Sequence, residues 1–295
     1  MSMRVNILSY EPAGGWILYD YAEKLVTHLR PHVDEVDLTS RQADGYDVTF
    51  HINYYGLDKP RAAGLHCTMV THIDTPEKFE LVKVHAKKRV WGFCMSEETR
   101  RRLNTLTGIP RFLSFAPPAM CTTVNKKISV MIAGRRYEDG RKNEQWALDF
   151  IRRLHPESLA VRVMGVGWGE QLARLDEEGY TVDYRETFDR DGYADMLRGS
   201  DYLLVTGNDE GALSTLDAII YGVVPIVTAQ GYHLEQPGEL RLFSTHEQLL
   251  AIADELQAGI DRTNRLRREM TDWDSFARRH VDAWRQIIAG LPVGG

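Results

Sequence analysis

Short apolar runs alternate with amphipathic segments along all 295 residues, and this alternation limits the possible folds more than any other feature. Arg4–Ser9 and Ile128–Ala133 have the length and composition of buried strands. Ile17–Leu29 and Asn143–Leu154 instead carry apolar residues at helical spacing. Strands that alternate with helices form parallel sheets whose faces are covered by the helices. We therefore predict an α/β protein.

The alternation restarts near residue 127, which indicates two domains. Ala119–Lys127 fits a linker, and the strand at 128–133 opens a second series of strands and helices. We predict one Rossmann-like domain over residues 1–126 and another over residues 127–272, facing each other across a cleft. Small-molecule sites usually lie in clefts between domains. Residues 273–295 follow, with helical spacing and no further strand.

Composition excludes several classes of protein. No apolar run approaches the ~18–20 residues that a membrane span requires, and the N-terminus lacks the pattern of a signal peptide. Cys67, Cys94 and Cys121 are widely spaced and odd in number, which argues against a disulfide framework. None of them belongs to a cluster with metal-ligand spacing. We expect reduced, mostly buried thiols in a cytoplasmic protein without a metal site.

A basic loop, Gly134–Lys142, follows one predicted strand and precedes a helix. Its cations Arg135, Arg141 and Lys142 could converge on a diphosphate, since guanidinium forks match phosphate oxygens and lysine adds a compact charge. A solvated basic loop is the alternative. The loop is not a Walker A motif, because GxxxxGK[ST] is absent.

Two glycine-rich turns also follow predicted strands. Gly14 and Gly15 lie in the first β-to-α turn, where glycine allows a backbone to approach a phosphate or sugar. A plain turn explains them equally well, and GxGxxG is absent. Gly165, Gly167 and Gly169 form the second turn, for which we favour a structural role over contact with a nucleotide base.

Three carboxylates surround the predicted start of a helix. Asp209, Glu210 and Asp217 could accept hydrogen bonds from the hydroxyl groups of a ribose or another sugar. Asp209 and Glu210 could equally serve the helix N-terminus as cap and dipole partner. Asp217 lies within the apolar segment Ala212–Val224, where a buried unpaired charge would be costly. Asp217 is therefore the strongest functional candidate of the three.

One histidine, His72, ends a strand that we expect to be buried, and could hydrogen-bond a sugar hydroxyl at the sheet edge. A lone histidine is more often structural.

Further along, the chain has a locally basic region that comprises Lys83, Lys87, Lys88, Arg89 and Arg100–Arg102. Such a region is typical of a solvated face but is also compatible with binding of an anionic lipid or an acidic acceptor.

These segments together resemble retaining glycosyltransferases of the two-Rossmann GT-B architecture, close to glycosyltransferase family 4. The resemblance spans nearly the whole chain and is strongest over residues 128–228. GR…RKN at 134–143 resembles the family's "GR…KG" segment, and EG…LDA…GVVP at 210–225 resembles its "EG…LEA…GVP" segment. Gly14 and Gly15 match its glycine-rich first loop, and His72 matches its cleft histidine.

The resemblance implies metal-independent glycosyl transfer from a nucleotide-sugar such as a UDP- or GDP-sugar, with retention and without a separate cofactor. The first domain would bind the acceptor and the second the donor, and Trp273–Ile288 would cross back to the first domain. Arg135 and Lys142, or Arg141, would hold the diphosphate. The implied donor contacts are Gly14, Gly15, Arg135, Arg141, Lys142, Gly211, Ser214 and Asp217, and the implied catalytic residues are His72, Asp209 and Glu210.

The chain departs from the family pattern at three positions. The family places two glutamates eight positions apart, whereas Glu210 and Asp217 are seven apart and Asp209 and Asp217 are eight apart. Either Asp209 or Glu210 could therefore be the first acid. The second acid is aspartate, and Asn143 stands where glycine is common.

Other functions remain open on the sequence. A non-catalytic nucleotide-sugar-binding protein would retain the fold without turnover, and a GT-B epimerase or phosphorylase would share the architecture. The sequence does not identify the donor's base or sugar, nor the oligomeric state. A glycan, a lipid-linked sugar and modified nucleic acid are all compatible acceptors, and we expect at most peripheral contact with a membrane.

Overall fold

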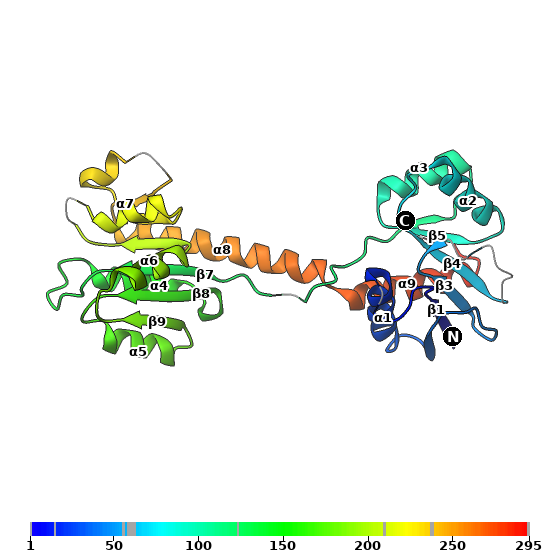
Figure 1. The fold of residues 1–295 in the computed structure, drawn as a ribbon, viewed down its shortest axis with the longest axis horizontal. Helices are drawn as coiled ribbons and strands as arrows, with labels where there is room; N and C mark the ends of the chain where they lie inside the picture. Colours follow the sequence, from blue (N-terminus) through cyan, green and yellow to red (C-terminus); the bar gives the residue numbers. More distant parts are fainter. Residues whose placement is uncertain are drawn as a thin grey trace. The chain divides into compact units, whose positions relative to one another are not determined.

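The structure is a computed structural model that describes residues 2–14, 16–54, 57, 63–122, 124–208, 211–236 and 239–293. The chain divides into two compact units, which are coloured by sequence in Figure 1. Unit 1 comprises Met1–Thr122 and Arg268–Gly295, and unit 2 comprises Thr123–Arg267. The corresponding boundaries predicted from the sequence are at residues 126 and 272. No helix among the described residues is long and apolar enough to cross a membrane.

Unit 1 is built on a six-stranded parallel sheet in the order β2-β1-β3-β4-β5-β6. Its strands are β1 (Arg4–Leu8), β2 (Glu35–Thr39), β3 (Val48–His51), β4 (Leu65–Val70), β5 (Trp91–Cys94) and β6 (Phe112–Ser114). Its helices are α1 (Ile17–Leu29), α2 (Pro76–Lys87), α3 (Glu97–Thr107) and α9 (Trp273–Ile288). Strand β5 is buried on both faces: Phe93 packs on the α1 and α9 side, and Cys94 packs on the α2 and α3 side.

The last helix, α9, belongs to the core of unit 1. It lies beside α1 on one face of the sheet, as Figure 1 shows. Trp273, Phe276 and Trp284 of α9 are buried against side chains of this sheet and of α1. The prediction that the C-terminal helix returns to the N-terminal sheet is therefore confirmed.

Unit 2 contains a second six-stranded parallel sheet, in the order β12-β11-β10-β7-β8-β9. Its strands are β7 (Ile128–Ala133), β8 (Leu159–Met164), β9 (Thr181–Arg185), β10 (Tyr202–Val205), β11 (Val224–Thr228) and β12 (Arg241–Phe243). Its helices are α4 (Glu144–Arg153), η2 (Pro156–Ser158), α5 (Gly169–Glu177), α6 (Arg190–Arg198), α7 (Leu213–Ile220), η3 (Gly231–Leu234) and α8 (His246–Met270), the last of which ends in unit 1.

The strand order of unit 2 is the Rossmann order, with β7 and β10 at the centre. Successive strands are added outward from β7 on one side and from β10 on the other, so the direction of winding reverses between these two strands. The predicted α/β class with two Rossmann-like units is confirmed by the two sheets. Cys67 and Cys94 are buried as expected, whereas Cys121 is exposed.

Helix α9 buries a histidine, His280, in the core of unit 1. The His280 ring is fully buried and packs against several aromatic side chains. Its centroid lies 4.4 Å from the ring centroid of Phe276, 4.5 Å from that of Phe115 and 5.1 Å from that of Phe93. Nδ1 bonds the Phe276 carbonyl at 2.9 Å, and Nε2 has no partner among the described residues. Burial lowers the pKa of His280 from its ordinary value of 6.5 to about 3.

Because the unfolded chain binds this proton more tightly than the folded one, the free energy of unfolding should be level above about pH 6.5 and fall towards pH 3. His280→Phe should reduce the slope in that window by up to about 1.4 kcal/mol per pH unit. Urea denaturation of both proteins at a series of pH values measures this difference. Parallel curves for the two proteins would contradict the assignment.

Candidate functional site

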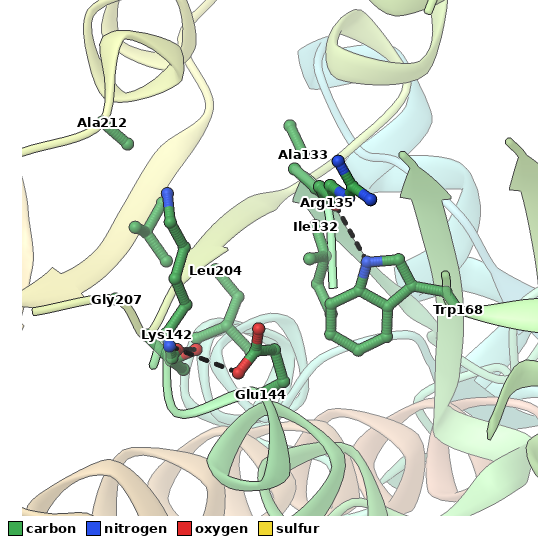
Figure 2. Close-up of a pocket in the computed structure, with 12 residues that line it drawn as sticks. Ile132, Ala133, Arg135, Lys142, Glu144, Trp168, Leu204, Gly207 and Ala212 are labelled. Carbon is green, nitrogen blue, oxygen red and sulfur yellow. Dashed lines mark hydrogen bonds between the residues drawn. The ribbon is translucent and has the colours of Figure 1, made fainter. Parts of the chain in front are cut away.

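A small pocket opens at the carboxyl edge of the unit 2 sheet, where β7 and β10 lie side by side (Figure 2). Open α/β sheets bind ligands at this point of strand-order reversal. The pocket has a volume of about 60 Å³, which suits a group the size of a phosphate rather than a whole nucleotide. It is lined by Ile132, Ala133, Gly134, Arg135, Lys142, Glu144, Trp168, Leu204, Val205, Thr206, Gly207 and Ala212.

Glu144 organises the basic loop from the inside. It is the first residue of α4 and is only 4% exposed. One carboxylate oxygen accepts the Tyr137 N–H at 2.7 Å, and the other accepts the Lys142 N–H at 3.3 Å. A carboxylate at this place is also favoured by the positive end of the helix dipole. The loop from 137 to 142 is therefore folded around an internal anion.

Two further hydrogen bonds tie the loop to the end of β10. Asn143 Nδ2 donates to the Thr206 carbonyl at 3.0 Å, and the Thr206 hydroxyl donates to the Lys142 carbonyl at 2.8 Å. Asn143 adopts the left-handed conformation, with φ 53° and ψ 40°. Asparagine tolerates this conformation better than most residues. The position therefore needs a residue that is stable at positive φ, which explains why asparagine can replace glycine here.

The turn after β8 is hydrogen-bonded to the start of the basic loop. Gly134 N–H bonds the Met164 carbonyl and Arg136 N–H bonds the Val166 carbonyl, both at 2.9 Å. The buried Trp168 indole N–H donates to the Gly134 carbonyl at 2.9 Å. A Cβ on Gly165 would lie 2.2 Å from the same carbonyl oxygen, so only glycine fits. These contacts favour the structural role predicted for this turn.

Three cations of the loop surround the Tyr137 ring. The distance to its centroid is 5.7 Å from the Arg135 guanidinium carbon, 4.3 Å from that of Arg141 and 5.9 Å from Lys142 Nζ. Arg135 and Lys142 line the pocket, whereas Arg141 does not. Arg141 instead forms an exposed ion pair with Asp139 and lowers the pKa of that carboxyl group. Figure 2 shows the Lys142 side chain extending from the loop toward Ala212.

The turn between β10 and α7 forms the opposite wall of the pocket. Asp209 and Glu210, two of the predicted catalytic residues, lie outside the described residues. Gly211 has φ 122°, and a Cβ there would lie 2.3 Å from the Tyr232 ring. The buried His233 side chain contacts this turn as well, since its Nε2 accepts the Ala212 N–H at 3.2 Å. Sequence reasoning missed His233, because the contact joins residues 21 positions apart.

Asp217 differs from the expectation of a buried charge. It lies on the exposed face of α7 and accepts a hydrogen bond from the Tyr193 hydroxyl of α6 at 2.9 Å. Burial of Asp217 was predicted from the apolar residues around it, but Leu213 and Ile220 are themselves 77% and 83% exposed. Asp217 and the half-buried Ser214 are outside the pocket lining, on the helix that follows Ala212.

The remaining predicted residues belong to unit 1. Gly14 lies between β1 and α1 with φ 70°, and a Cβ there would meet no atom within 4 Å. Gly15 lies outside the described residues. His72 is exposed just beyond β4, where Nδ1 lies 3.0 Å from the Thr71 hydroxyl. Among the described parts of both units, no group of three or more His, Cys, Asp or Glu side chains could hold a metal ion.

Comparison with solved structures finds similarity to glycosyltransferases at low sequence identity. Anabaena Alr3699/HepE in complex with UDP-glucose is 12% identical over 98% of both chains, with a TM-score of 0.38. The lipopolysaccharide outer core galactosyltransferase WaaB is 12% identical over 98% of this chain and 100% of its own, also with a TM-score of 0.38. AviGT4, a glycosyltransferase involved in avilamycin A biosynthesis, is 15% identical over 98% and 99% of the two chains, with a TM-score of 0.34.

The chain matches no protein-family model and no curated protein. Sequence identities this low indicate a similarity of fold alone.

Gly165 and Gly140 both have positive φ, but only Gly165 lies against the backbone of Gly134, so alanine substitutions at the two positions should differ in their cost in stability. Gly165→Ala should destabilise unit 2 by about 3 kcal/mol, because its Cβ collides with a backbone oxygen. Gly140→Ala should cost only about 1 kcal/mol of backbone strain, since nothing lies within 4 Å of its Cβ. Urea denaturation measures both values. Equal losses would show that the contact with Gly134 does not hold the loop.

The left-handed conformation of Asn143 predicts an order among substitutions. Asn143→Gly loses the hydrogen bond to Thr206 but relieves the strain, whereas Asn143→Ala loses the bond and keeps the strain. The alanine variant should therefore be less stable than the glycine variant by about 1 kcal/mol. Thermal or urea unfolding of the two variants tests this order, and the reverse order would mean that conformation is not the constraint at this position.

Proposed function

We propose that this protein is a retaining, metal-independent glycosyltransferase of the GT-B type, related to glycosyltransferase family 4, that uses a nucleotide-sugar donor. The observation that carries the proposal is the pocket at the reversal of strand order in unit 2, into which Arg135 and Lys142 bring positive charge. The "GR…RKN" segment supports it, because its residues Gly134, Arg135 and Lys142 line this pocket, and Ala212 of the "EG…LDA…GVVP" segment lines it as well.

In the proposed mechanism, Arg135 and Lys142 hold the donor's diphosphate as it leaves. Negative charge accumulates on the diphosphate as the glycosidic bond breaks, so fixed cations stabilise the transition state more than the ground state. N–H groups in the first turn of α7 add to this effect. Lys142 is favoured over Arg141 for this role, because Lys142 lines the pocket and Arg141 does not.

The negative charge of Glu144 reduces the positive potential that Arg135 and Lys142 create in the pocket. Its carboxylate is buried beside the two cations and offsets part of their positive potential. Both of its oxygens already accept backbone N–H groups, which reduces its repulsion of a bound phosphate. We propose that Glu144 positions Lys142 and does not itself contact the donor.

Asp217 is proposed to bind the donor's ribose. The Tyr193 hydroxyl donates a hydrogen bond to Asp217 Oδ2, and Asp217 Oδ1 can still accept one from a ribose hydroxyl. A ligand whose diphosphate enters the pocket would place its nucleoside outside it, because the pocket is small. Gly14, Gly15, Gly211 and Ser214 are proposed as further donor contacts on the basis of the family resemblance.

The transferred sugar is proposed to be oriented by His72 and by Asp209 or Glu210, again from the family resemblance. The leaving phosphate would take the proton of the acceptor hydroxyl on the face from which it departs, so the anomeric configuration is retained. No protein nucleophile is then needed.

A donor-binding experiment with matched lysines tests the proposal. Lys142→Ala should weaken binding of the preferred nucleoside diphosphate, chosen among UDP, GDP, ADP and dTDP, by at least about tenfold, as expected for loss of a charge-assisted contact. Lys127→Ala removes the same charge at the opposite end of β7 and should leave binding unchanged. Isothermal titration calorimetry gives both affinities.

Turnover of the matching nucleotide-sugar in the presence of EDTA, with the product anomer assigned by NMR, tests the catalytic part. Binding without turnover against a broad acceptor panel would favour the non-catalytic alternative. If the wild-type protein binds none of the four nucleoside diphosphates, the proposal is wrong.

A further inference from the structure

The start of α7 lacks the side chain that usually fixes a helix N-terminus. Its N-cap residue is Ala212, whose side chain has no oxygen to accept a hydrogen bond from the first turn. The first N–H groups of a helix have no partner within the helix and need one from elsewhere. In this chain the partner of the Ala212 N–H is a histidine ring from a later segment of the chain.

His233 bridges two parts of unit 2. It lies in η3, just after β11, and its side chain is 1% exposed. Nδ1 is 2.9 Å from the carbonyl oxygen of Thr228, the last residue of β11. Nε2 accepts the Ala212 N–H at 3.2 Å, and the Thr215 hydroxyl lies 3.1 Å from the same nitrogen. The ring therefore connects the end of β11 to the first turn of α7.

These contacts also fix the state of the ring. A carbonyl oxygen can only accept, so Nδ1 must carry the proton. Nε2 faces an N–H donor, so it must present its lone pair. Only the neutral Nδ1–H tautomer makes both bonds. The neighbouring residue strengthens the same link, since the Tyr232 ring packs against Gly211 and its hydroxyl donates to the Ala212 carbonyl.

We propose that His233 is a positioning residue that sets the direction of the α7 first turn, and so places its N–H groups for the donor diphosphate; this inference rests on the proposed function. Ala212 lines the pocket opposite the basic loop. A shift of the α7 start would therefore change the wall that faces Lys142 without removing any group that contacts the ligand.

Two substitutions separate this role from simple filling of the core. His233→Leu keeps the bulk but removes the hydrogen bonds of the ring, and should weaken binding of the nucleoside diphosphate that the wild type binds best by about tenfold. His233→Gln keeps one acceptor and one donor on its terminal amide and should restore affinity to within about threefold of the wild type. Isothermal titration calorimetry measures the affinities, and hydrogen exchange measures protection of the amides from Ala212 to Thr215.

A third variant controls for loss of stability. Tyr180→Phe removes another buried hydrogen bond of unit 2, from the Tyr180 hydroxyl to the Leu154 carbonyl, away from α7. It should destabilise the unit but leave the affinity and the exchange of the α7 amides unchanged. His233→Leu should accelerate exchange at the α7 start selectively.

The inference is overturned if His233→Leu binds with wild-type affinity, if its α7 amides exchange at the wild-type rate, or if His233→Gln folds but binds as weakly as His233→Leu. A loss of affinity in Tyr180→Phe equal to that in His233→Leu would overturn it too, since general stability would then explain both. A wild-type protein that binds no nucleoside diphosphate would overturn the proposed function itself, a result that the exchange data distinguish from failure of the positioning role.

Discussion

The candidate site exists because the helices that follow β7 and β10 leave the sheet toward opposite faces. Leu148 and Ile151 of α4 pack on one face, and Ala218 of α7 packs on the other. The two connecting loops must therefore diverge above adjacent strand ends, and the space between them cannot be filled by either helix. Every other feature of the site, including the basic loop and the turn at Gly211, depends on this divergence.

The space between the loops is narrow and is lined by side chains of both charge signs. Arg135 and Lys142 bring positive charge to it, while the buried Glu144 carboxylate holds their loop by its backbone. An isolated buried carboxylate would be costly, but two backbone N–H groups and the start of α4 stabilise this one. The arrangement favours a small anion over a large one, because the cavity measures only about 60 Å³. It also links the position of Lys142 to the conformation of the loop from 137 to 144.

Much of the fold follows from local sequence patterns. The alternation of apolar runs and helical spacing predicts the parallel sheets, and the direction of each strand then places Arg135 and Lys142 beyond the end of β7. Several elements were not predicted, among them α2, α8 and β12. For α2 a local signal existed, since Thr75 caps the helix and Pro76 begins it. The apolar run Ser114–Pro118 contributes only its first residue to β6 (Phe112–Ser114), and Pro117 and Pro118 lack the N–H that a strand needs.

Other features could not be predicted locally. His233 and Trp168 act through contacts with residues 21 and 34 positions away, and no periodic pattern records such contacts. Asp217 shows the opposite failure: apolar neighbours suggested burial, yet α7 presents Leu213, Leu216 and Ile220 to solvent. Glu144 resembles any acidic residue at the start of a helix, and only the structure shows that its carboxylate is buried within the basic loop.

The most direct measurement of the central claim is a crystal structure of the protein with its preferred nucleoside diphosphate bound. The account predicts that the diphosphate lies in the unit 2 pocket, within hydrogen-bond distance of Lys142 Nζ and the Arg135 guanidinium, with its far side toward the first turn of α7. The account is contradicted if the diphosphate binds elsewhere on the chain, or if it occupies this edge of the sheet without contact to either cation.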